Sequence, residues 1–71
     1  MAEEIRAEIV GNVLKVVAKS GDLLGIGDTL VILESMRMEI PVQAAAPGTV
    51  RSIVVSEGDV VREGDLLAVM E

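Results

Sequence analysis

Near the midpoint of the 71-residue chain, the sequence reads Glu34-Ser35-Met36-Arg37-Met38-Glu39-Ile40. One apolar run, residues 30–33, precedes this stretch, and a second, residues 40–42, begins at its last residue. The pattern predicts a turn between two strands, yet the four residues 35–38 include no Gly, Asn, Asp or Pro. Tight hairpins favour Asn-Gly or Asp-Gly where the backbone needs positive φ. The composition of this turn therefore needs a reason other than turn formation.

Outward from the turn, every apolar run is too short for a helix, and the turn residues between the runs predict short strands. The predicted segments are strand 4–10, a tight turn at Gly11-Asn12, strand 13–17, strand 29–34 and strand 38–43. Pro41 lacks a backbone N–H, so its strand should lie at a sheet edge or carry an irregularity.

The sequence repeats itself at an offset of 37 residues. Residues 11–34 align without a gap on residues 48–71, and nine of the 24 positions are identical. The identities include both Gly-Asp pairs of each copy, at 21–22 and 27–28 and at 58–59 and 64–65. Glycine supplies φ freedom and aspartate favours turns, so both copies should share one fold.

The repeat predicts an all-β fold for residues 1–71 as a single domain. Repeat 1 covers about 1–34, the tip 35–38, and repeat 2 about 38–71. Two four-stranded halves related by an approximate two-fold axis would pack their apolar faces into a flattened eight-stranded barrel or sandwich. The same symmetry predicts that the two chain ends lie opposite the central turn.

Composition excludes several classes of function. With 51% hydrophobic and 25% charged residues, the chain should fold. It has no aromatic residue, cysteine or histidine, and its formal net charge is -6, which argues against base stacking, disulfides, zinc sites and nucleic-acid binding. The acidic N-terminus lacks the order of a secretory signal and no apolar run reaches membrane-spanning length, so we expect a cytoplasmic protein without membrane contact.

The central stretch resembles the Glu-Ala/Ser-Met-Lys-Met signature of biotinyl domains in the biotinyl/lipoyl attachment family. The resemblance extends to residues 46–50, 58–61 and 63–67, at the family's customary spacing. It implies the flattened eight-stranded barrel called a barrel-sandwich hybrid, with the acceptor residue at a hairpin tip. Met36 and Met38 match the signature of the biotinyl branch of this family, which the sequence therefore resembles more. Lipoyl domains usually carry Asp-Lys-Ala at the hairpin tip. The chain most resembles a small stand-alone biotin attachment protein of the biotin carboxyl carrier type.

The resemblance also implies a mechanism and partners. In the family, biotin protein ligase presents biotinyl-adenylate, and a neutral lysine ε-amine attacks its acyl carbon to form an amide. The biotin then carries a carboxyl group between biotin carboxylase and carboxyltransferase components. Such a domain is a monomeric carrier with no catalytic residue or metal of its own. The positions carried over are Arg37 for the acceptor, Met36 and Met38 beside it, and Glu34, Ser35 and Glu39 for ligase recognition.

The sequence departs from the family signature at the reactive residue, because position 37 is Arg where the signature has Lys. Lysine has a reference pKa of about 10.4 and can become a neutral nucleophile, whereas that of arginine is above about 12 and its cation is delocalised. We therefore expect no biotin on this chain, and Lys15 and Lys19 lie outside any acceptor context. Three explanations stay open: a deliberate Lys-to-Arg replacement that keeps the protein unmodified, natural loss of the acceptor, or a tip that only binds a partner.

Two alternative functions also follow from the sequence. The first is a lipoyl-type acyl carrier in a multienzyme complex. The second is an unmodified protein-interaction domain that uses the same tip.

Overall fold

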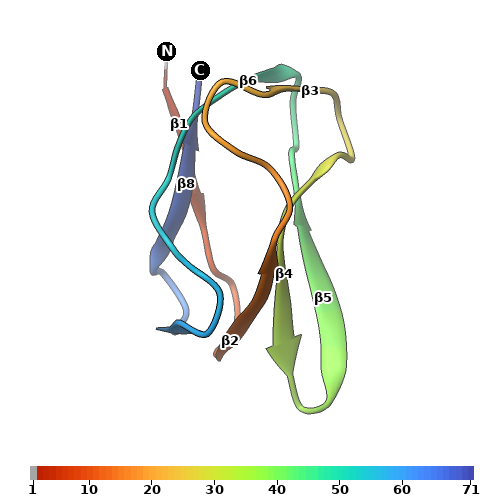
Figure 1. The fold of residues 1–71 in the computed structure, drawn as a ribbon, viewed down its shortest axis with the longest axis vertical. Coiled ribbons are helices and arrows are strands. Elements are labelled where there is room, and N and C mark those ends of the chain that lie inside the picture. Colours follow the sequence, from red (N-terminus) through yellow and green to blue (C-terminus); the bar gives the residue numbers. More distant parts are fainter. Residues whose placement is uncertain (1) are drawn as a thin grey trace.

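The computed structural model describes residues 2–71, which form eight β-strands and no helix (Figure 1). The strands are β1 Glu3–Arg6, β2 Gly11–Val16, β3 Leu23–Leu24, β4 Thr29–Ser35, β5 Met38–Gln43, β6 Gly48–Ile53, β7 Val60–Val61 and β8 Leu66–Met70. The predicted all-β, flattened eight-stranded fold is confirmed.

The strands form two four-stranded antiparallel sheets, in the orders β1-β8-β6-β3 and β5-β4-β2-β7. Each sheet takes two strands from each sequence repeat, so the repeats interlock and neither one forms a sheet by itself. A shift of 37 residues converts one sheet order into the other. The register irregularity between Val13 and Lys15 likewise recurs between Val50 and Ser52.

The prediction of a tight turn at Gly11-Asn12 is wrong. Both residues lie inside β2, and β1 ends at Arg6 in the other sheet. A Cβ at Gly11 would stand 2.6 Å from the carbonyl oxygen of Glu34, and one at Gly48 equally close to that of Glu71. Glycine is needed here because another backbone passes close by, which sequence reading mistook for a turn signal.

The Gly-Asp pairs do form turns. The four glycines have φ between 88° and 95°, a left-handed conformation that strains other residues. The carboxylate of each following aspartate accepts a hydrogen bond of 2.8–2.9 Å from the backbone N–H three residues before it. These contacts involve Asp22, Asp28, Asp59 and Asp65. Among residues 2–71, no group of three or more acidic side chains is arranged to hold a metal ion.

The core consists of two apolar clusters with the same plan. The first contains Ala7, Val13, Val31, Leu33, Val61 and Leu67. The second contains Ala18, Leu30, Ala44, Val50, Ala68 and Met70. Five members of the first cluster have their repeat equivalents in the second, and no charged or polar side chain of the described residues is buried. Leu30 and Leu67, which are equivalent, are both fully buried.

The molecule is elongated, with Cα extents of 32 × 18 × 17 Å. β1 starts and β8 ends side by side at one end, where Glu3 pairs with Met70. The turn between β4 and β5 lies at the other end of the long axis (Figure 1). The predicted placement opposite the central turn is therefore observed for the start of β1 and the end of β8, whereas Met1 lies outside the described residues.

β5 is an edge strand, as Pro41 predicts. Pro41 lies opposite Ile32, three positions from the hydrogen-bonded pair Ser35–Met38 that closes the hairpin, and so falls in a non-hydrogen-bonded pair. Since antiparallel pairs alternate, its nitrogen faces the open edge and the sheet loses no hydrogen bond. The missing donor also makes this edge a poor template for another strand.

Candidate functional site

The candidate site is the tip of the β4–β5 hairpin. Ser35 pairs with Met38, so only Met36 and Arg37 form the loop. Their φ angles are 53° and 65°, which is the pattern of a type I′ turn. Left-handed conformations cost about 1–2 kcal/mol for residues with a Cβ, so this turn carries a local strain that Asn-Gly would avoid.

The hairpin is held by the most buried strand of its sheet. β4 lies between β5 and β2, and Leu30, Val31 and Leu33 are buried in the two core clusters. Six register pairs connect β4 with β5 as far as the tip. A side chain at position 37 is therefore displayed on a rigid support, which keeps its position reproducible for a partner.

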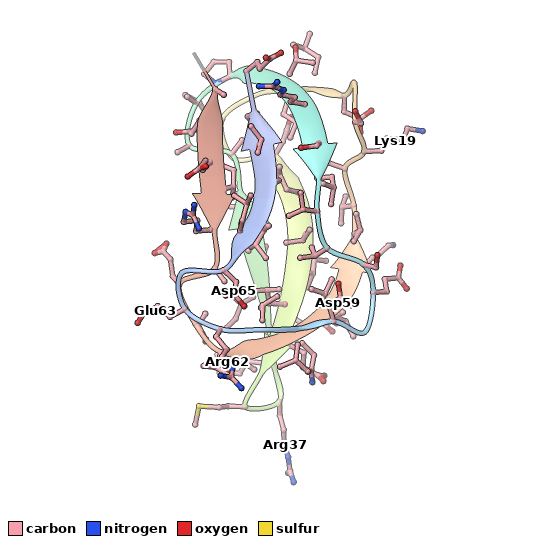
Figure 2. The ribbon with its side chains drawn as sticks, turned by 90° about the vertical axis from the view of Figure 1, so that its left-hand side faces the viewer. Lys19, Arg37, Asp59, Arg62, Glu63 and Asp65 are labelled. Atoms are coloured by element: carbon pink, nitrogen blue, oxygen red, sulfur yellow. The ribbon has the colours of Figure 1, made fainter. Side chains whose placement is uncertain are left out.

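The side chains of the loop face solvent. Met36 is 90% exposed and Met38 64% exposed, although both are apolar. Arg37 extends beyond the turn at the end of the molecule, away from the other labelled side chains (Figure 2). Within residues 2–71 it forms no ion pair and no side-chain hydrogen bond. The tip thus presents one unpaired cation between two exposed thioethers.

Two carboxylates lie directly below the tip. Glu34 and Glu39 are opposite each other in the register of β4 and β5, and both are exposed. They follow the hydrogen-bonded pair that closes the hairpin, so they fall at a non-hydrogen-bonded position, where side chains approach most closely. Like charges directly opposite destabilise a strand pair. Sequence reading selected both residues but did not identify this juxtaposition, which depends on strand register.

The structure brings all six sequence-selected residues together at one end of the barrel. Five are exposed, and Ser35 is half-buried in the pair that closes the turn. None of the six lines the open hollow of about 570 Å³ between the segments 16–20 and 53–57. That hollow escaped sequence analysis, although its apolar lining comes from repeat-related positions such as Val16 and Ile53.

The side chain at position 37 does not fit the covalent attachment of biotin, which needs a lysine amine to form an amide. The group displayed there is a guanidinium, a delocalised cation without the free amine that acylation needs. The described residues include two lysines. Lys15 lies within β2 and Lys19 follows it, so neither is at a hairpin tip, and Figure 2 shows Lys19 far from Arg37.

The strain at the tip leads to a prediction about stability. We expect the double replacement Met36→Asn with Arg37→Gly to stabilise the protein by about 1–2 kcal/mol, because both residues then suit a type I′ turn. Urea unfolding would measure this free energy. Unchanged or reduced stability would contradict the assignment of strain to the loop, and the same replacements at the extended positions Glu39 and Ile40 should destabilise.

Comparison with known sequences identifies relatives. The sequence model of a family described as "Biotin-requiring enzyme" matches residues 2–70. The biotinylated protein TB7.3 homolog of Mycobacterium leprae is 62% identical over 48 residues, which cover 68% of each protein. The homolog of Mycolicibacterium smegmatis is 68% identical over 44 residues, 62% of each protein. The second alignment thus spans less than two thirds of that relative.

Solved structures show the same fold. A crystal structure of Kluyveromyces lactis urea carboxylase superposes with a TM-score of 0.95 and 39% identity, covering all of this chain but 6% of that one. The lipoyl domain of the 2-oxoglutarate dehydrogenase complex from Azotobacter vinelandii gives 0.81 and 28%, covering 96% and 94% of the two chains. No helix in residues 2–71 is long and apolar enough to cross a membrane.

The sequence match covers residues 2–70, and the solved structures share the fold over all or nearly all of this chain. The chain belongs to the biotin/lipoyl attachment domain family.

Proposed function

We propose that the chain is a biotin-carrier-type domain of a biotin-dependent carboxylase system whose tip is unable to accept biotin. The observation that carries the proposal is the display of Arg37, exposed and unpaired, at the tip of the β4–β5 hairpin, the position that the sequence resemblance assigns to the acceptor. The biotinylated TB7.3 relatives and the urea carboxylase structure support the biotin branch. The chain contributes a scaffold and no catalytic group.

The proposal separates display from reactivity. Display depends on the backbone of the β4–β5 hairpin, on the core beneath it and on the distance of the tip from the chain ends. Reactivity depends on a neutral amine at position 37. Because arginine keeps a positive charge and approximate length but provides no such amine, only reactivity is lost.

A single replacement tests the proposal. We expect Arg37→Lys to gain one biotinyl group when incubated with biotin, ATP, Mg²⁺ and a bacterial biotin protein ligase. The parent protein should gain none under the same conditions. Intact-mass spectrometry measures the change, and peptide mapping should locate the group on residue 37.

Two further variants control for the other amines. Lys15→Arg and Lys19→Arg, each introduced into the Arg37→Lys protein, should leave labelling unchanged. Labelling of the parent protein would contradict the chemical argument about arginine. A folded Arg37→Lys protein that stays unlabelled would overturn the proposed carrier function.

The lipoyl-type carrier remains the second candidate, because the Azotobacter vinelandii lipoyl domain has the same fold over 96% of this chain. Incubating Arg37→Lys with lipoate, ATP and a lipoate ligase separates the two. Labelling by the lipoate ligase alone would favour acyl transfer. An unmodified interaction domain would instead capture a partner with Arg37 in place and lose it on replacement of Met36 or Met38.

The expected partners follow from the carrier role. They are biotin protein ligase and the biotin carboxylase and carboxyltransferase components. The proposal places a monomer in the cytoplasm. The monomeric state is tested directly by sedimentation equilibrium of the parent protein.

A further inference from the structure

The tip presents exposed apolar and acidic side chains around Arg37 that a partner could contact. Met36 and Met38 are exposed, and Glu34 and Glu39 form the next register pair of the hairpin, both with exposed side chains. The only ion pairs among residues 2–71 join Arg6 to Glu4 and Arg51 to Glu71. The two tip carboxylates are therefore left without a cation, although they stand where like charges repel.

This arrangement stabilises nothing within the chain itself. The apolar Met36 and Met38 gain no burial, the turn is strained, and the charges of Glu34 and Glu39 oppose each other. Local features that cost stability without a structural return mark functional surfaces. A partner that covers the methionines and brings a basic side chain between the carboxylates would turn each cost into a gain.

We infer that the chain is a decoy acceptor, which binds biotin protein ligase through its tip and competes with acceptors that carry lysine. The inference rests on the proposed function and adds a regulatory role to it. Binding and transfer are separable, since transfer needs a neutral amine while binding uses the surface around it. With Arg37 in the ligase site, no bond forms and the complex dissociates unchanged.

The surface around residue 37 also predicts the strength of inhibition. An interaction made equally in the ground state and the transition state changes KM and leaves kcat unaltered. The contacts of Met36, Met38, Glu34 and Glu39 are the same in the parent protein and in Arg37→Lys. The inhibition constant of the parent should therefore lie within about threefold of the KM of Arg37→Lys, provided that transfer is slow relative to dissociation.

The experiment measures biotin transfer to Arg37→Lys by a bacterial biotin protein ligase at several concentrations of the unlabelled parent protein. We expect the apparent KM for Arg37→Lys to rise linearly with the parent, at constant kcat. Labelling of Arg37→Lys that is unaffected by a large excess of parent would overturn the decoy and leave the carrier function intact. Inhibition that lowers kcat instead of raising KM would also overturn it. A folded but unlabelled Arg37→Lys would instead defeat the carrier function on which the inference rests.

A matched pair of variants tests the acidic face. The double variant Glu34→Gln with Glu39→Gln, made in the parent protein, removes two negative charges from the tip. It should weaken inhibition about fivefold or more, because a basic partner is then attracted less strongly. Glu71→Gln is the control, since Glu71 is the repeat equivalent of Glu34 at the opposite end of the barrel. It should inhibit like the parent. Equal inhibition by all three folded proteins, as judged by thermal unfolding, would show that the carboxylates do not recognise the ligase.

Discussion

Leu30→Ala and Leu67→Ala should each destabilise the protein by about 2–5 kcal/mol and leave much of either variant unfolded at 25 °C. Both side chains are fully buried, one in each core cluster. Removing a buried leucine side chain costs its transfer free energy and the cavity left behind. A core of this size supplies only a few kcal/mol of net stability, so a single cavity is enough to unfold it.

The pair of leucines also tests the equivalence of the two repeats. Since the leucines occupy matching positions 37 residues apart, the two losses should agree within about 1 kcal/mol. Leu23→Ala is the control, because Leu23 is 80% exposed and its truncation should change stability by less than about 0.5 kcal/mol. Urea unfolding gives the free energy for Leu23→Ala, and circular dichroism without urea gives the folded fraction, and hence the free energy, for Leu30→Ala and Leu67→Ala. A large difference between Leu30→Ala and Leu67→Ala would show that one cluster dominates the core.

Gly11→Ala should destabilise the protein by about 1–3 kcal/mol, because the added methyl group would lie 2.6 Å from the carbonyl oxygen of Glu34. The obstacle is backbone within β4, which is paired on both sides by β2 and β5. The clash is relieved only if the end of β4 shifts, immediately before the turn between β4 and β5. The variant therefore couples packing in the barrel to the position of residue 37.

Gly48→Ala is a control with the same geometry. Its methyl group would meet the carbonyl oxygen of Glu71 at 2.6 Å, and Glu71 follows the end of β8, where its backbone exchanges two hydrogen bonds of 2.8 Å with Thr49. Glu71 is outside the register that pairs β1 with β8, whereas Glu34 lies in a strand paired on both sides, so the loss of stability should be smaller than for Gly11→Ala. Thermal unfolding compares the two proteins. Equal losses would mean that the chain end is held as firmly as the base of the hairpin.

Made in the Arg37→Lys protein, the two glycine variants separate fold from function. Gly11→Ala should slow biotin labelling at temperatures where the protein is still folded, because the displaced base of the hairpin shifts the acceptor. Gly48→Ala should label at the normal rate, since its clash lies at the opposite end of the molecule.

The sequence by itself determined a large part of this protein. The 37-residue repeat and the Gly-Asp pairs specified short strands, four equivalent turns and an all-β barrel. Such features are local, since a glycine with positive φ and an aspartate that caps its own turn act within three residues. The unusual residues of the central turn also identified the tip, because a turn without turn-forming residues conflicts with local preference.

Only the tertiary structure decided how the two repeats interlock, why Gly11 is a glycine and how Glu34 meets Glu39. Each depends on contacts between segments distant in sequence: strand order across two sheets, a carbonyl group 23 positions away along the chain, and the register of two strands. Gly11 was mistaken for a turn residue because glycine serves both turns and close approach, and sequence does not distinguish them. Local preference fixed the elements, whereas long-range packing fixed their partners.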